Sequence, residues 1–239
     1  VDLYMEDLLE AGRGYNHPEL VEFLAKNTWP TIKWTIDYLG VDHVDKLTHL
    51  GGHSVPRSYK TKEGTGWGWV KKELEKLREL GGNVQTETKF TNFVKSKDGT
   101  IEGIEILDGH AFGQEDSGTQ KYVKANRGVV LASGGFGNDK EMRMDQNPSL
   151  TEDFDTTNHP GATGEALREA MSNGANPIQL SWIQLGPWNS PDDIKVSLVT
   201  TFVHGIAIDP QTGRRVVNEL GDRRERSQAW LDVGKEPEY

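Results

Sequence analysis

Cysteine is absent from the 239 residues of the sequence. Its absence excludes disulfide bonds, cysteine-ligated zinc, iron–sulfur clusters, thiol nucleophiles and covalently attached haem from these residues. No apolar run reaches the roughly 18–20 residues that a membrane-spanning helix needs, so we expect no membrane span. The seven histidines are scattered along the chain, and we expect no metal site.

Positive charge is also scarce, because 27 Lys and Arg residues stand against 37 Asp and Glu residues, which leaves a net charge of −10. A broad nucleic-acid-binding surface needs many cations to neutralise phosphates, so this balance predicts no nucleic-acid partner. The length suits one large domain or two small ones, since domains usually have roughly 100–200 residues.

Apolar residues recur at helical spacing through the first 41 residues. Pro18 favours a helix start there, and Gly40 favours a helix end. A further helix is predicted over residues 70–80, where the apolar side chains fall on one face. Aromatic residues at such spacing are typical of a packed core rather than of a cofactor site.

Short β-type runs follow this helix, and the dipeptide Asp98-Gly99 between two of them indicates a hairpin. The predicted strands are residues 84–88, 91–94, 101–107, 121–124 and 128–131. Residues 108–120 are predicted as a loop, because they contain little apolar side chain. A helix, a β-meander and then a buried strand predict an α/β fold class with α+β character.

The last part of the chain predicts further helices and two more strands. An acidic helix follows Asn138, and another helix covers residues 165–173 before a glycine. Irregular structure is expected over residues 177–191, which are rich in Trp, Gly and Pro. Strands are expected over residues 197–203 and 206–208.

Three segments carry chemical information, and the first is GVVLASGGFG at residues 128–137. An apolar strand that ends in glycines lets a ligand approach the backbone closely, as a dinucleotide does at a strand end of an α/β sheet. A tight turn after a core strand is the alternative interpretation. The full G-x-G-x-x-G fingerprint is absent.

The second segment is TNHPGATG at residues 157–164. Gly164 precedes a predicted helix, whose first N–H groups are available to an anion or another ligand. The alternative interpretation is capping by Thr163, together with a turn that Pro160 and Gly161 impose.

The third segment is RRVVNELGDR at residues 214–223. A charge run of this kind is usually a solvated face. Alternatively, one buried guanidinium polarises a substrate, or passes a proton if it is held beside carboxylates. The spacing alone favours neither interpretation.

The order of these segments resembles that of the flavoprotein subunits related to fumarate reductase and succinate dehydrogenase, most of all the soluble flavocytochrome-type fumarate and urocanate reductases. Matching motifs cover nearly the whole chain in the same order. They are NHPELV at 16–21, GGHSVPR at 51–57, GTG at 64–66, VLASGGF at 130–136, TNHPGATG at 157–164 and GRRVVNE at 213–219.

The resemblance implies FAD as the cofactor and an FAD-binding domain that is interrupted by a capping domain. By this resemblance residues 1–178 are part of the FAD-binding domain, and residues 179–239 begin the capping domain. It also implies that the residues matching family contacts bind the flavin. These residues are Ser54, Arg57, Thr65, Gly66, Ala132, Ser133, Gly134, Gly135, Thr157, Asn158 and Gly164.

The reaction implied by the resemblance is reduction of an activated carbon–carbon double bond. FAD N5 delivers a hydride to the carbon β to an electron-withdrawing group, and Arg223 matches the arginine that family members use as proton donor. Because arginine is a weak acid at its usual pKa, this role requires an enclosed site and a proton relay. Asp222 and Glu219 are candidates for that relay by their proximity in the sequence.

Two departures from the family pattern concern the substrate. Gly186 stands where fumarate reductases carry a substrate-binding histidine, and residues 198–202 read LVTTF where those enzymes carry relay residues. An incomplete dicarboxylate clamp favours a urocanate-like, acrylate-like or cinnamate-like acid over fumarate. The electron donor is expected to be a domain or protein outside this chain.

The family's amino-terminal Gly-rich unit and the later part of its cap have no match in the sequence. We therefore expect an internal piece of a protein about twice as long, with poor FAD binding and no activity of its own. One alternative is a ketosteroid dehydrogenase-like flavoenzyme, for which Tyr59 is the candidate proton abstractor. The other alternative is an inactive truncated domain or a binding module.

Overall fold

The computed structural model describes residues 1–186, 189–190 and 204–233. The chain divides into two compact units, each built from segments far apart in the sequence. Unit 1 comprises Val1–Asn83, Leu185–Asn189 and Ser197–Tyr239, and unit 2 comprises Val84–Gln184 and Ser190–Val196. The predicted domain boundary between residues 178 and 179 is a different division of the chain and stays a prediction.

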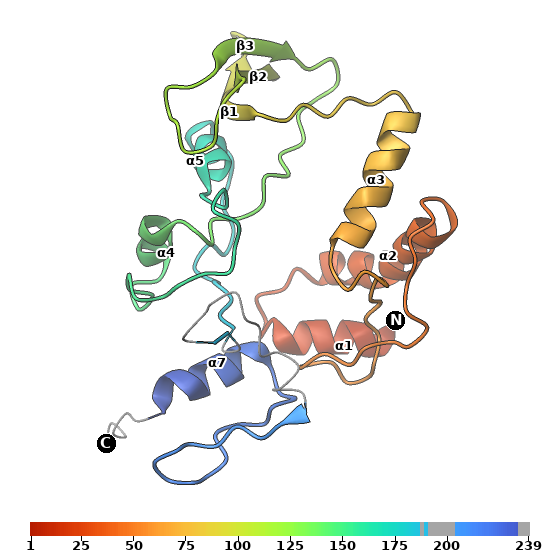
Figure 1. Ribbon diagram of the computed structural model, residues 1–239, viewed down its shortest axis with the longest axis vertical. Helices are drawn as coiled ribbons and strands as arrows, with labels where there is room; N and C mark the ends of the chain where they lie inside the picture. Colours follow the sequence, from red (N-terminus) through yellow and green to blue (C-terminus); the bar gives the residue numbers. More distant parts are fainter. Residues whose placement is uncertain (187–188, 191–203, 234–239) are drawn as a thin grey trace. The chain divides into compact units, whose positions relative to one another are not determined.

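Unit 1 is helical (Figure 1), and its labelled helices are α1 (Asp2–Ala11), α2 (Pro18–Asp37), α3 (Trp67–Glu79) and α7 (Arg223–Asp232). As predicted, α2 begins at Pro18, because a proline needs no hydrogen bond from its nitrogen in the first turn. The chain leaves this helical region at Gly40, which has a φ of +72°. Helix α1 packs against α2, on which Val21 and Ala25 are buried.

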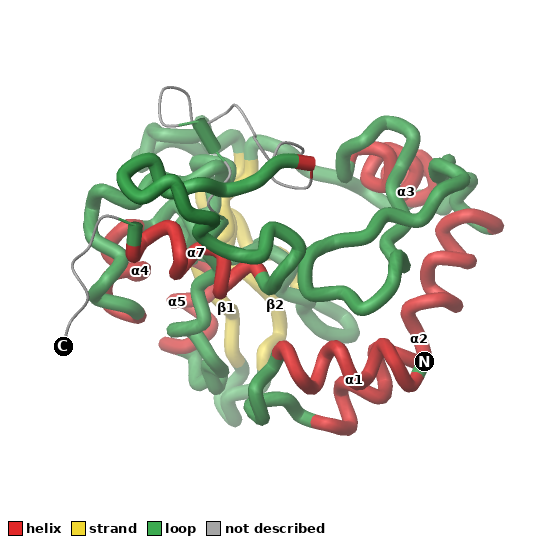
Figure 2. The backbone as a smooth tube through the Cα atoms, turned by 90° about the horizontal axis from the view of Figure 1, so that it is seen from below, coloured by secondary structure: helices red, strands yellow, loops and turns green. Residues whose placement is uncertain are grey.

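Unit 2 contains a three-stranded antiparallel sheet in the order β1 (Thr88–Lys95), β2 (Ile101–Asp108) and β3 (Thr119–Lys124), drawn in yellow in Figure 2. The turn between β1 and β2 contains Gly99 at a φ of +89°, which confirms the predicted hairpin. Helix α5 (Glu165–Ser172) packs against β1, and α4 (Lys140–Gln146) precedes it in the chain. The β-meander is therefore confirmed.

The predicted strand over residues 128–131 is wrong. These residues form no regular element, and the side chain of Val130 is 90% exposed. A fully apolar strand is typical of a sheet that has neighbouring strands and covered faces, and the described residues include no strand paired with this segment. Without a partner the segment has no ladder hydrogen bonds.

Two other strand predictions are corrected at their limits. Residues 84–87 lie outside β1, because Glu87 has a φ of +52° and so interrupts an extended backbone just before Thr88. The predicted strand over 206–208 is reduced to one bridge between Ile208 and Arg215. The predicted strand over 197–203 lies outside the described residues.

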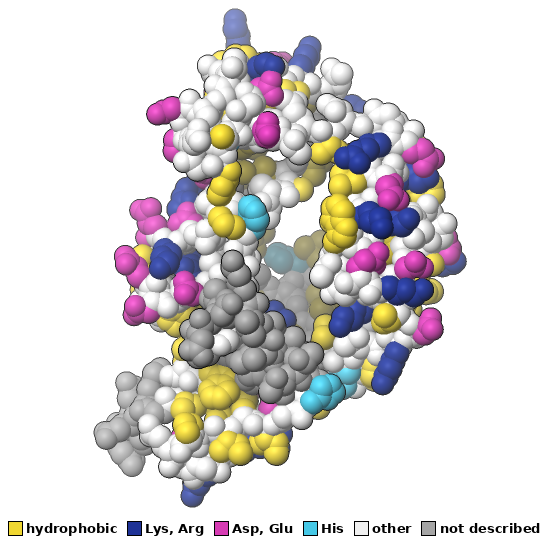
Figure 3. Space-filling view, in the orientation of Figure 1, with side chains coloured by type: hydrophobic (Ala, Val, Ile, Leu, Met, Phe, Trp, Pro, Cys, Tyr) yellow, Lys and Arg dark blue, Asp and Glu magenta, His cyan; other side chains and the backbone are white. Residues whose placement is uncertain are grey.

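Helix α2 keeps large apolar side chains at the surface of the described structure. Phe23, Trp29 and Trp34 are 67%, 51% and 47% exposed. The space-filling view shows hydrophobic side chains interspersed with charged ones on the visible face (Figure 3). None of the helices in the described part of the chain has the length and apolar character needed to cross a membrane.

Candidate functional site

The loop that contains Ser54 and Arg57 is fastened to helix α1 by one carboxylate. Asp7 Oδ2 accepts hydrogen bonds from the Ser54 amide at 3.0 Å and from Ser54 Oγ at 2.9 Å, and it forms an ion pair with Arg57 Nη1 at 2.7 Å. Arg57 Nη2 also donates to Ser54 Oγ at 2.9 Å. The Ser54 amide, more than the Ser54 hydroxyl and Arg57, holds the pKa of Asp7 below its usual value. Two predicted flavin contacts therefore belong to one local network.

The same loop, residues 51–57, contacts the segment that leads into α7. The Gly52 amide donates to Leu220 O at 3.3 Å. A Cβ added at Gly51 would lie 2.6 Å from Gly221 O, so this close approach of two backbones requires glycine. The contact joins two motifs that are far apart in the sequence.

Arg223, the predicted proton donor, is the first residue of α7 and is exposed. Asp222 caps this helix, because its Oδ1 accepts hydrogen bonds from the amides of Arg224 at 2.8 Å and Glu225 at 3.3 Å. One of the two predicted relay carboxylates is therefore a helix cap. The proton-donor role of Arg223 stays a prediction.

Glu219, the other predicted relay carboxylate, is buried and bound to groups of its own. It accepts hydrogen bonds from the Ala207 amide at 2.7 Å and from Arg215 Nε at 3.0 Å. The Arg215 side chain outweighs the opposing effect of burial and lowers the pKa of Glu219 to about 2. Glu219 is therefore ionised at neutral pH and ties residue 207 to the motif at 213–219.

Thr65 and Gly66 lie at the beginning of α3. Gly66 is the N-cap residue and provides no side-chain hydrogen bond to the helix. A Cβ at Gly66 would meet no atom within 4 Å, so the space beside this helix end is open among the described residues. The amides of Gly68 and Trp69 in the first turn already donate to Thr65 O and Gly66 O, so a phosphate contact at this helix start stays a prediction.

Aromatic side chains of unit 1 line a cavity of about 570 Å³ that Arg57 also borders. The Tyr59 ring stacks on Trp29, with 5.6 Å between the ring centroids, and contacts His43 edge-on at 5.6 Å. Tyr59 is thus part of an aromatic wall. No contact of Tyr59 assigns it a role in proton abstraction.

In unit 2 the structure brings together the two motifs that contain glycine. The Asn138 amide donates to Ala162 O at 2.9 Å, and Asn138 Nδ2 donates to Pro160 O at 3.0 Å. A Cβ at Gly137 would lie 2.2 Å from Asn158 Nδ2. The GGFG turn and the turn at residues 157–164 therefore pack directly on each other.

Helix α5 extends this packing from Gly164, its N-cap residue. Gly164 has a φ of +69°, and a Cβ there would lie 2.7 Å from Phe136 Cβ. Arg168 forms an ion pair with Asp139 and donates to Thr163 O at 3.1 Å. The Arg168 hydrogen bond keeps the pKa of Asp139 below its usual value. Asp139 and Arg168 thus hold the 157–164 turn in place.

The predicted contacts at residues 132–135 form an exposed turn. Ala132, Ser133, Gly134 and Gly135 are all exposed, and Gly134 has a φ of +83°. A Cβ at Gly134 or Gly135 would meet no atom within 4 Å. Such an open glycine backbone fits the close approach of a dinucleotide. Thr157 and Asn158 are exposed as well.

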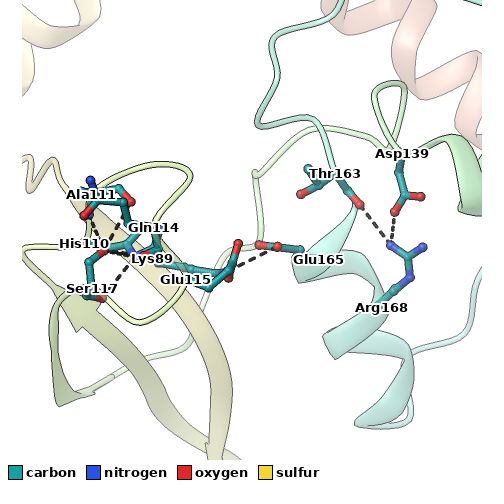
Figure 4. Close-up of polar contacts among 10 residues, drawn as sticks. All are labelled: Lys89, His110, Ala111, Gln114, Glu115, Ser117, Asp139, Thr163, Glu165 and Arg168. Carbon is teal, nitrogen blue, oxygen red and sulfur yellow. Dashed lines mark hydrogen bonds and ion pairs between the residues drawn. The ribbon is translucent and has the colours of Figure 1, made fainter.

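A second polar cluster in Figure 4 stabilises the loop between β2 and β3. Lys89 Nζ on β1 lies 2.7 Å from Glu115 Oε2 and 3.4 Å from Glu165 Oε1, and Glu115 raises the pKa of Lys89. Ser117 Oγ lies 3.0 Å from His110 Nδ1 and closes the loop on itself. This cluster confirms the loop that was predicted for this region.

Four charged residues that organise these motifs were not identified from the sequence: Asp7, Asp139, Arg168 and Arg226. Asp139 has the usual signal of an N-cap residue before a helix. The others have no local signal, because their partners come from distant parts of the chain. Among the described residues, no group of three or more His, Asp or Glu side chains is arranged to hold a metal ion.

A family model described as FAD binding domain matches residues 1–238. The chain belongs to this family. FAD is therefore confirmed as the cofactor that the sequence predicted, and the open glycine turn at residues 132–135 fits such a ligand. The predicted resemblance to flavoprotein reductases is confirmed by the relatives below.

The acrylate reductase flavoprotein subunit of Shewanella woodyi is 39% identical over 237 residues, which are 97% of this chain and 47% of that protein. Fumarate reductase 1 of Saccharomyces cerevisiae is 31% identical over 233 residues, covering 92% of this chain and 48% of that protein. The open conformation of a flavocytochrome c3 fumarate reductase shares the fold with a TM-score of 0.77 and 26% identity, over 99% of this chain and 40% of that chain. The chain thus spans about half the length of the curated relatives it matches.

Proposed function

We propose that the protein reduces the activated carbon–carbon double bond of an unsaturated carboxylic acid, with FAD as cofactor and Arg223 as proton donor. The observation that supports this most is the contact between two motifs in unit 1. The turn before Arg223 packs on the 51–57 loop, and that loop carries Ser54 and Arg57. The proton donor and two flavin contacts thus share one folded unit.

Saturating the double bond requires one hydride, which carries two electrons, and one proton. Bound FAD in its reduced form supplies the hydride and is oxidised. The chain's own residues bind the cofactor and hold the proton at the Arg223 guanidinium, from which it passes to the carbon beside the electron-withdrawing group. The proposed FAD-binding residues are Ser54, Arg57, Thr65, Gly66, Ala132, Ser133, Gly134, Gly135, Thr157, Asn158 and Gly164.

The proposed substrate is an acrylate-like monocarboxylic acid rather than fumarate. Gly186 offers no side chain to bind a second carboxylate. A relative with 39% identity is named acrylate reductase flavoprotein subunit, which supports the same choice. The other departure, at residues 198–202, lies outside the described residues. We also propose that an electron donor outside this chain restores the reduced flavin, and that this chain by itself reduces no acid.

The test is a single-turnover experiment on the full-length, FAD-loaded protein that contains this chain, because the chain by itself is not proposed to react. The flavin is reduced anaerobically with dithionite and mixed with acrylate, and its reoxidation is followed by absorbance. Arg223→Ala should slow reoxidation by about 10²–10⁴-fold, the usual contribution of a general acid, and leave FAD content unchanged. Arg224→Ala, at the exposed neighbouring position, is the matched control and should react like the parent. Unchanged reoxidation in Arg223→Ala removes the acid role, and fumarate reacting as fast as acrylate removes the substrate assignment.

A further inference from the structure

The 51–57 loop has a second anchor, a buried arginine one helical turn beyond Arg223. Arg226 is 5% exposed, and its Nη1 donates to Glu219 O at 3.0 Å. A Cβ at Gly51 would lie 2.9 Å from Arg226 Nη2, so the guanidinium lies directly against this glycine. Arg226 therefore contacts both the loop and the turn that leads into α7.

These contacts restrain the start of α7 at two residues, Arg226 and Leu220. Residues three apart on a helix lie on neighbouring positions of its surface, so Arg223 and Arg226 move together when the helix shifts. Glu219 O and Gly51 restrain Arg226, and the Gly52 amide restrains Leu220 on the same turn. A rotation or translation of α7 would have to break these contacts.

On its other side the 51–57 loop is restrained by α1. Asp7 binds the Ser54 amide and hydroxyl and pairs with Arg57, whose side chain is 17% exposed. The guanidinium of Arg57 also lies 5.0 Å from the ring centroid of Tyr4. The loop is thus held between the half-buried carboxylate of Asp7 and the buried guanidinium of Arg226.

We propose that Arg226 is a positioning residue that keeps the proton donor Arg223 in register with the flavin-binding residues Ser54 and Arg57. This inference rests on the proposed function. The 51–57 loop connects the two: Ser54 and Arg57 bind the cofactor, and Gly51 and Gly52 contact the residues that set the position of α7. Because a misplacement of about 1 Å can slow a reaction by about 10²-fold, this register matters for the proton transfer more than for binding.

The test variant is Arg226→Met, which keeps roughly the length of the side chain but removes its charge and hydrogen-bond donors. Arg226→Lys restores the charge, and Arg224→Met is the control at an exposed position of the same helix. Amide hydrogen exchange at Gly52, which needs no substrate, should become about tenfold faster in Arg226→Met. In the full-length, FAD-loaded protein, reoxidation of the reduced variant by acrylate should slow by about 10–10²-fold, with FAD content and KM for acrylate within about threefold of the parent. Arg226→Lys should recover part of the rate, and Arg224→Met should match the parent in both measurements.

Unchanged exchange at Gly52 in Arg226→Met, or a normal reoxidation rate, overturns the proposal. The proposal is also overturned if Arg226→Met lowers the FAD content or raises KM for acrylate while the reoxidation rate stays normal. If Arg226→Met does not fold, Gly51→Ala provides the same test from the loop side, because its Cβ would collide with Gly221 O and Arg226. If the full-length parent is not reoxidised by any unsaturated acid, the proposed function fails. In that case, unchanged amide exchange at Gly52 in Arg226→Met separately overturns the positioning role of Arg226.

Discussion

The 51–57 loop of unit 1 and the 157–164 turn of unit 2 are held in place by different kinds of interaction. In unit 1 the 51–57 loop depends on charged side chains: Asp7 from α1 pairs with Arg57 of the loop, and Arg226 reaches the loop from α7. In unit 2 the 157–164 turn is also held by the Asp139–Arg168 ion pair, but most of its contacts are backbone hydrogen bonds and close packing at glycines. The first loop is therefore sensitive to charge and pH, and the second is sensitive to side-chain volume.

The largest effect is expected from adding volume to the turn in unit 2. Gly164→Ala forces an alanine into a φ of +69° and brings its Cβ to 2.7 Å from Phe136 Cβ. Backbone strain of about 1–2 kcal/mol and overpacking of about 1–3 kcal/mol should together lower the free energy of unfolding by about 3 kcal/mol. Urea denaturation measures this loss. Gly174→Ala, with a φ of +96° and no atom near its Cβ, is the control that isolates the backbone contribution.

A smaller loss is expected from removing the charge that anchors the loop in unit 1. Asp7→Asn breaks the ion pair with Arg57 and leaves that largely buried guanidinium without its carboxylate. The free energy of unfolding should fall by about 2 kcal/mol, in the range seen when hydrogen bonds to charged groups are lost. The control is Glu6→Gln on the same helix, an exposed position where less than about 0.5 kcal/mol is expected. Equal effects at positions 6 and 7 would contradict the role of Asp7.

The smallest effect is a pH dependence that belongs to unit 1. Because Arg215 lowers the pKa of Glu219 from 4.5 to about 2, this carboxylate stabilises the fold above pH 4.5 and loses that contribution as the pH falls toward 2. The loss should be on the order of 1 kcal/mol, since the Arg215 partner is exposed and screened by solvent. Unfolding curves between pH 6 and pH 2 measure it. Glu219→Gln should remove this part of the pH dependence, and an unaltered slope would show that another group causes it.

Local features of the fold could be predicted from the sequence, because their causes lie within a few residues. Pro18 begins α2, and Asp98-Gly99 turns the chain between β1 and β2, as the pattern indicated. The run at residues 128–131 has an equally clear apolar pattern, but a strand also needs a partner, and a partner is not a local property. Features whose causes lie within a few residues can therefore be predicted from the sequence, and features that need a partner from a distant part of the chain cannot.

The candidate site shows the same limit. Its glycine motifs and Arg223 could be named from the resemblance, but the residues that hold them could not. Asp7 meets Ser54 across 47 positions, and Gly51 meets Arg226 across a still longer separation. These residues become neighbours only in the folded chain, so their spacing in the sequence does not predict the contacts.

The contact between Gly51 and Arg226 has a consequence for evolution and for library design. A Cβ at position 51 would lie 2.6 Å from Gly221 O as well as 2.9 Å from Arg226 Nη2, so shortening residue 226 leaves the backbone collision in place. Glycine should consequently be retained at position 51 whichever residue stands at 226, and a library that varies both positions should yield functional combinations only among the members that keep Gly51.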